Sequence, residues 1–169
     1  MLPIIIVLIS LLLDGFLTNI LPYTVENLSL LTPSLTLISL LLLIYPFYRK
    51  KEMKYTILIL ITGVIYDLLY TNLLFFNAIL FYIVIRIMQY IYKNYEINYF
   101  TIIINTIIAI TTYEVLQVII ISIYNLYPIT LYSLVYKIKS SLLLNIIYAE
   151  LIYFIISIIP RKYRKININ

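Results

Sequence analysis

Four carboxylates lie inside long apolar runs of this chain, and their side chains are the ones that could most readily do chemistry. They are Asp14, Asp67, Glu114 and Glu150. A charged side chain that faces lipid costs roughly 2.5–3.5 kcal/mol at the centre of an inserted helix. We therefore expect each carboxylate to face the interior of a helical bundle, to be protonated, or to pair with polar groups.

Three uses of these carboxylates fit their positions. They could hold helices together, with amide partners that each contribute about 1 kcal/mol in a membrane. They could form a proton or cation relay. Asp14 and Asp67 could also act as general acid and base, as in membrane aspartyl proteases, although no GxGD-type stretch flanks either residue. The amides that could serve as partners are Asn77, Asn105, Gln117 and Asn145.

Several residue types on which enzymes depend are missing. The chain has no cysteine and no histidine, which removes the thiolate nucleophile, the commonest general base and the usual transition-metal ligand. Its two glycines, Gly15 and Gly63, cannot build a phosphate-binding loop. The sequence therefore predicts no catalytic residue, no metal site and no cofactor, and a protein that is not an enzyme.

The composition indicates a membrane protein. Of the 169 residues, 64% are hydrophobic and only 11% are charged, and the mean hydropathy is +1.06. A soluble domain of this size has too little interior for so much apolar surface. The net charge of +5 does not indicate nucleic-acid binding, because the basic residues cluster at the ends of the apolar runs, where they act as topology signals.

Six apolar runs predict an all-α integral membrane protein in which residues 1–169 form one domain, a compact bundle of six transmembrane helices. Most runs approach the roughly 20 residues that cross a bilayer, and no repeat period is evident. Thr71-Asn72 predicts a tight turn between the third and fourth runs. The runs cover about residues 2–21, 34–48, 55–70, 73–92, 99–123 and 141–159.

The distribution of basic residues predicts the topology. With the N-terminus in the cytoplasm, ten of the twelve lysines and arginines fall on the cytoplasmic side, so both termini are predicted to be cytoplasmic. Lys137 and Lys139 are the two exceptions. They end the segment PITLYSLVYKIK (128–139), which we expect to be an amphipathic stretch on the outer surface before the last helix. In the alternative interpretation this segment is buried and only five helices cross the membrane.

Two further residues need an interpretation. Gly63 precedes Asp67 by four residues and so shares its helical face, which indicates a contact surface that another helix can approach closely. Arg86 lies inside the fourth run. Its side chain could extend toward the inner headgroups, or it could form an ion pair with a buried carboxylate.

Several segments, taken in order, resemble the rod shape-determining protein MreD family of low-GC Gram-positive bacteria. LLLDGFLTNILP (11–22) resembles the first helix of that family, and Pro33-Ser34 with LTLISLLLLIY resembles its proline-led second helix. The Gly63-xxx-Asp67 helix, the Thr71-Asn72 turn and the Asn77-Ala78 step resemble its most recognisable region. SSLLLNIIYAELIYFIISIIPRKYRK (140–165) resembles the closing helix, with Asn145 and a basic end.

The resemblance implies a multi-pass protein of the bacterial plasma membrane that maintains cell shape as a non-enzymatic subunit of the peptidoglycan-synthesising elongation machinery. The partners that it implies are the single-span protein MreC, the actin-like MreB, the polymerase RodA and a class B penicillin-binding protein. A homodimer is left open, membrane lipid is expected, and nucleic acid is not. The residues that we expect to pack helices or bind a partner are Asp14, Gly15, Gly63, Asp67, Asn77, Glu114, Asn145 and Glu150.

One alternative function remains at this stage. The MreD fold looks similar to the substrate-binding subunits of energy-coupling-factor transporters, which bind vitamins. That function would need a cavity open to the outside, and Asp14, Asp67 and Glu114 could line one.

Overall fold

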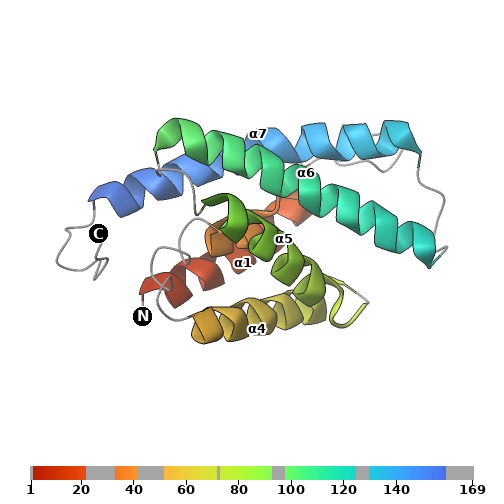
Figure 1. Cartoon of the computed structure of the whole chain (residues 1–169), viewed down its shortest axis with the longest axis horizontal. Helices are drawn as coiled ribbons and strands as arrows, with labels where there is room; N and C mark the ends of the chain where they lie inside the picture. Colours follow the sequence, from red (N-terminus) through yellow and green to blue (C-terminus); the bar gives the residue numbers. More distant parts are fainter. Residues whose placement is uncertain are drawn as a thin grey trace.

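The computed structural model describes residues 2–21, 33–41, 52–71, 73–92, 98–124 and 130–158. The described part of the chain contains six helices (Figure 1). The helices are α1 (Leu2–Ile20), α2 (Leu35–Ser39), α4 (Glu52–Tyr70), α5 (Phe76–Tyr92), α6 (Tyr99–Ile123) and α7 (Leu131–Ile158).

The described helices form two antiparallel pairs, and α1 and α2 pack beside these pairs (Figure 1). α4 pairs with α5 and α6 pairs with α7, while α5 also packs on α6. Figure 1 shows α6 and α7 crossing one side of the molecule, with α1 and α4 on the other. The short α2 contacts both α1 and α7. It therefore links the first helix to the last.

The core lies where α2, α4, α5 and α6 meet. Leu37, Ile59, Val84 and Met88 are completely buried there. Tyr55 is buried as well, and its hydroxyl donates a hydrogen bond to the Leu40 carbonyl at 2.9 Å. The outward sides of the helices carry large apolar side chains that stay exposed, as expected for a surface that lipid covers.

Several helix ends differ from their predicted positions. α4 begins three residues before the predicted start of its run, and α5 begins three residues after. The largest difference is in α7, because residues 131–139 form its first turns and are not a separate surface segment. Thr130 and Ser133 cap this start reciprocally, with each backbone N–H donating to the other hydroxyl at 3.2 Å. No helix-breaking residue follows, so the helix continues.

Among the described residues, three helices are long and apolar enough to cross a membrane: α4, α6 and residues Leu131–Ile155 of α7. α1 and α5 contribute shorter apolar helices over Ile4–Ile20 and Phe76–Ile91. The second half of the predicted run 34–48 lies outside the described residues, as do most of the basic loop residues. Six crossings and the charge-based topology therefore stay predictions.

Candidate functional site

The carboxylate of Asp67 binds the beginning of the next helix. Asp67 lies in the last turn of α4 and is fully buried. Its two oxygens accept the Asn77 backbone N–H at 3.0 Å each, and Oδ2 accepts the Ala78 N–H at 3.3 Å. The first N–H groups of a helix have no partner within it, and a negative charge there is favourable. Asp67 thus caps α5 from a neighbouring helix.

Further contacts fix this junction between α4 and α5. The Asn77 side-chain amide donates to Asp67 Oδ1 at 2.8 Å, and its Oδ1 accepts the Tyr113 hydroxyl of α6 at 2.6 Å. Gly63, one turn before Asp67, faces the Ala78 backbone so closely that an added Cβ would lie 2.8 Å from the Ala78 nitrogen. The turn passes through Phe75 with φ at 66°, in the left-handed region. The junction therefore joins three helices.

Asp14 performs the same task at the junction between α1 and α2. It is 1% exposed, and its Oδ1 accepts the Leu35 N–H at 2.7 Å. Its Oδ2 accepts the Thr36 N–H at 2.8 Å and the Thr36 hydroxyl at 2.5 Å. Ser34 is the N-cap residue of α2, and its own side chain makes no capping hydrogen bond. The carboxylate of another helix takes over that role.

The α1–α2 junction is also tied to distant parts of the chain. The Ser34 N–H donates to Asn145 Oδ1 of α7 at 2.9 Å. The Tyr70 hydroxyl of α4 donates to the Leu11 carbonyl at 2.7 Å, and the Tyr70 ring fills the space beside Gly15. Ser10 and Tyr148 share a short hydrogen bond between their hydroxyls. Helices α1, α2, α4 and α7 therefore meet around this junction.

The two junctions share a ten-residue pattern in the sequence. This pattern was not recognised from the sequence, because it occurs as two separate copies without a regular repeat period. A small residue, an aspartate and a Thr-Asn pair recur at the same spacing, as Ser10, Asp14, Thr18-Asn19 and as Gly63, Asp67, Thr71-Asn72. Each threonine hydroxyl donates to the carbonyl of its aspartate, at 2.7 Å from Thr18 and 3.2 Å from Thr71. The pattern could have identified the two capping carboxylates from sequence.

The carboxylates of the two glutamates have fewer hydrogen-bond partners than those of the two aspartates. Glu114 of α6 is 5% exposed, and its Oε1 accepts the Ser141 hydroxyl of α7 at 3.1 Å. Its Oε2 is buried with no hydrogen-bond partner, and the same holds for Oε1 of Glu150 in α7. Lys137, one turn before Ser141, interacts electrostatically with Glu114. No hydrogen bond between described residues connects the two glutamates to the aspartates.

Two tyrosines lie within electrostatic range of three of the carboxylates. Tyr66 of α4 and Tyr113 of α6 each interact electrostatically with Asp14, Asp67 and Glu114. Sequence reasoning missed both, because tyrosine makes up 19 of the 169 residues and so carries little positional signal. In both aspartates, backbone N–H groups donate to both carboxylate oxygens.

A comparison with known protein families found a match. The family model described as rod shape-determining protein MreD matches residues 1–163. No curated protein and no solved structure matches the chain.

Proposed function

The chain belongs to the rod shape-determining protein MreD family, and on that premise we propose that it is a non-enzymatic scaffold of the cell-wall elongation machinery. Members of this family are membrane proteins of cell-shape determination, and this much holds for the chain. The proposal adds that it crosses the plasma membrane several times, binds the transmembrane helix of an MreC-like protein and so helps to organise peptidoglycan synthesis. MreB, RodA and a class B penicillin-binding protein would join through that complex.

The use of the buried carboxylates carries this proposal. Asp14 and Asp67 each accept at least three hydrogen bonds, and helix-start backbone groups supply most of them. A general acid or a transport site needs a carboxylate that can exchange its partner for substrate or a proton. These two hold helices in place, which favours a rigid assembly platform.

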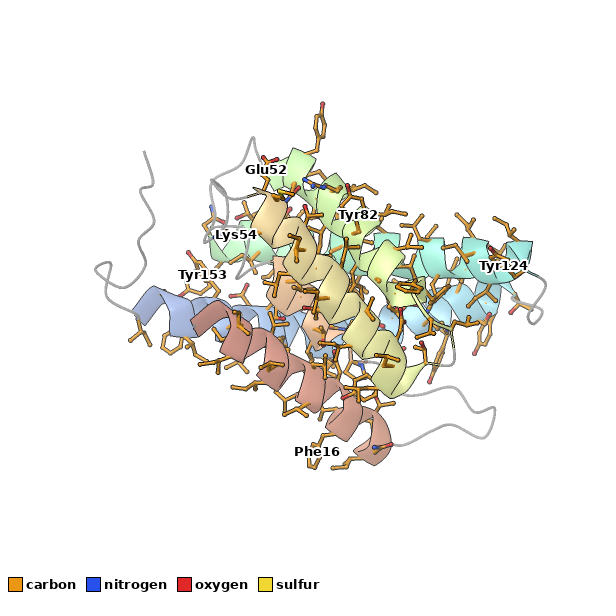
Figure 2. The ribbon with its side chains drawn as sticks, turned by 90° about the horizontal axis from the view of Figure 1, so that it is seen from below. Phe16, Glu52, Lys54, Tyr82, Tyr124 and Tyr153 are labelled. Atoms are coloured by element: carbon orange, nitrogen blue, oxygen red, sulfur yellow. The ribbon has the colours of Figure 1, made fainter. Side chains whose placement is uncertain are left out.

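We assign the partner helix to the outer side of α1. Leu8, Leu12 and Phe16 follow each other at four-residue spacing and are 49%, 67% and 61% exposed. They form one row on a helix, and Phe16 points away from the bundle (Figure 2). Helices in membranes associate mainly by close packing of such side chains. A single partner helix lying along this row would bury it.

The ten-residue pattern supplies a matched control for this assignment. Asp14 corresponds to Asp67, so Leu12 and Phe16 correspond to Ile65 and Leu69 of α4, which are also exposed. The test is co-purification of tagged MreC with each variant from native membranes. Leu12→Ala with Phe16→Ala should lower the MreC yield about tenfold, as expected when large anchor side chains are lost. Ile65→Ala with Leu69→Ala should leave the yield within about twofold.

Two outcomes would contradict the proposal at different levels. Equal losses from both double variants would mean that the partner does not select the α1 row. A wild-type chain that fails to associate with MreC both in detergent and in lipid would remove the scaffold function itself. Size-exclusion chromatography of the purified chain tells a self-associated dimer from the hetero-complex.

A second candidate function is the binding of a vitamin by a transporter subunit. It is favoured by the electrostatic interactions of Tyr66 and Tyr113 with three carboxylates, those of Asp14, Asp67 and Glu114. A thermal-shift screen of the purified protein against water-soluble vitamins separates the two. A reproducible shift with one vitamin, lost in Tyr113→Phe, would favour transport. Uniform melting with every vitamin would leave the scaffold.

A further inference from the structure

Arg86 is a cation in the apolar α5 helix, and among the described residues its contacts are with neutral groups. Its Nη2 donates to the Thr56 hydroxyl of α4 at 2.8 Å, and its Nη1 donates to Gln89 Oε1 at 2.9 Å. Its guanidinium carbon lies 5.2 Å from the centre of the Tyr82 ring. The Thr56 hydroxyl in turn donates to the Glu52 carbonyl at 2.9 Å. These contacts fix the position of the guanidinium between α4 and α5.

The charge of Arg86 needs a counter-ion that the described residues do not supply. A guanidinium has five N–H donors, and the hydrogen bonds to Thr56 and Gln89 use two of them. The sequence left an ion pair with a buried carboxylate open, but the four intramembrane carboxylates make no hydrogen bond with Arg86 in the described structure. A cation at membrane depth is costly unless it is paired.

The position of Arg86 along the hairpin indicates what the counter-ion is. Arg86 lies six residues before Tyr92, the end of α5, which places it about 9 Å along the axis from that end. Thr56 lies four residues after the start of α4, at the same end of the antiparallel pair. An arginine at this depth brings its guanidinium to the headgroup region.

The sequence that adjoins this end of α4 and α5 is rich in basic residues. Lys54 lies in the first turn of α4, and in Figure 2 Glu52 and Lys54 mark this end of α4, with Tyr82 on the neighbouring α5. In the sequence, Arg49, Lys50 and Lys51 directly precede α4, and Lys93 directly follows α5. Basic pockets between transmembrane helices bind the headgroups of anionic lipids.

We propose that Arg86, Thr56, Gln89 and Tyr82 form a binding site for the phosphate of an anionic phospholipid in the leaflet at the basic end of α4 and α5. The remaining N–H donors of the guanidinium match a phosphate with two parallel hydrogen bonds. Thr56 and Gln89 hold the fork in the required orientation, and the Tyr82 ring covers its face. The site lies on α4 and α5 and does not involve the α1 row assigned to the partner.

The test is native mass spectrometry of the delipidated, full-length protein titrated with phosphatidylglycerol or phosphatidylcholine. The wild type should prefer phosphatidylglycerol. Arg86→Gln should weaken phosphatidylglycerol binding about tenfold, as expected for the loss of a charge-assisted contact, and leave phosphatidylcholine binding unchanged. The phosphatidylglycerol affinity of Arg86→Lys should lie between those of the wild type and Arg86→Gln, because an ammonium keeps the charge but lacks the two parallel donors of a guanidinium. Lys137→Gln, a charge removed from α7, should behave as wild type.

Three results would overturn the site. The first is an unchanged lipid preference in Arg86→Gln, which would show that the guanidinium does not select the anionic headgroup. The second is a loss of preference in Lys137→Gln equal to that in Arg86→Gln, which would mean that only net charge matters. The third is displacement of phosphatidylglycerol by millimolar glycerol 3-phosphate, which would make the site one for a free phosphate. Arg86→Lys, which keeps the charge, serves if Arg86→Gln does not fold.

Discussion

The α1–α2 and α4–α5 junctions solve the same physical problem with different partners. In both, an aspartate near the end of one helix caps the beginning of the next. At Asp67 the capped residues follow within eleven positions, and a backbone contact at Gly63 reinforces the junction. At Asp14 they follow after 21 and 22 positions, and Asn145 of α7 must complete the site. The α4–α5 junction is local, whereas the α1–α2 junction depends on the assembled bundle.

The largest effect should come from removing either capping carboxylate. Asp14→Leu leaves the Leu35 and Thr36 N–H groups unpaired, and Asp67→Leu leaves those of Asn77 and Ala78 unpaired. Each variant should lose roughly 3–5 kcal/mol of unfolding free energy, because each unpaired buried donor costs about 1–3 kcal/mol. Unfolding by sodium dodecyl sulfate in mixed micelles measures this. A loss below about 1 kcal/mol in either variant would show that water satisfies the donors.

The two glycines should differ strongly although both lie in tight contacts. A Cβ on Gly63 would meet the backbone of Ala78, which cannot move without shifting α5, whereas a Cβ on Gly15 would meet the ring end of Tyr70. Gly63→Ala should therefore cost about 3 kcal/mol, and Gly15→Ala about 1 kcal/mol. The same unfolding assay compares them. If the order were reversed, the α1–α4 contact would be the more rigid of the two.

The amide variants sharpen the comparison at a smaller scale. Both oxygens of Asp14 accept short backbone hydrogen bonds, so an amide NH₂ in Asp14→Asn must face an N–H donor. In Asp67→Asn an NH₂ in place of Oδ2 loses the long Ala78 bond at 3.3 Å, while the Asn77 N–H, which Oδ1 and Oδ2 share at 3.0 Å each, keeps Oδ1 as its acceptor. We expect losses of about 2 kcal/mol for Asp14→Asn and about 1 kcal/mol for Asp67→Asn. Equal losses would mean that charge, not hydrogen-bond direction, governs both caps.

The sequence predicted the class of the protein better than it predicted which residues contact each other. Apolar runs and the family resemblance led to an all-helical membrane protein of the MreD family, and both are confirmed. The shared face of Gly63 and Asp67 followed from helical spacing, but the residue opposite Gly63 did not. The approach of Ala78 depends on a left-handed turn at Phe75, a conformation that bulky residues rarely adopt.

The remaining differences have similar physical causes. Asn145 binds Ser34 across 111 residues, and no local signal encodes such a pairing. The start of α7 was predicted ten residues late, because two lysines suggested a surface segment although nothing there breaks a helix. That Asp14, Gly63 and the other candidate residues bind a partner protein stays a prediction.

The smallest effect should come from Glu114, which marks the limit of the comparison. Unlike the two aspartates, it uses one oxygen for the Ser141 hydroxyl and leaves the other without a hydrogen-bond partner. Glu114→Gln keeps the first contact through its carbonyl oxygen, so stability should change by no more than about 0.5 kcal/mol. Ser141→Ala provides the control, because it removes the same hydrogen bond and should cost about 1 kcal/mol. If Glu114→Gln instead cost as much as Asp14→Asn, Glu114 would be needed as a charge opposite Lys137, and the α6–α7 pair would contain a third essential carboxylate.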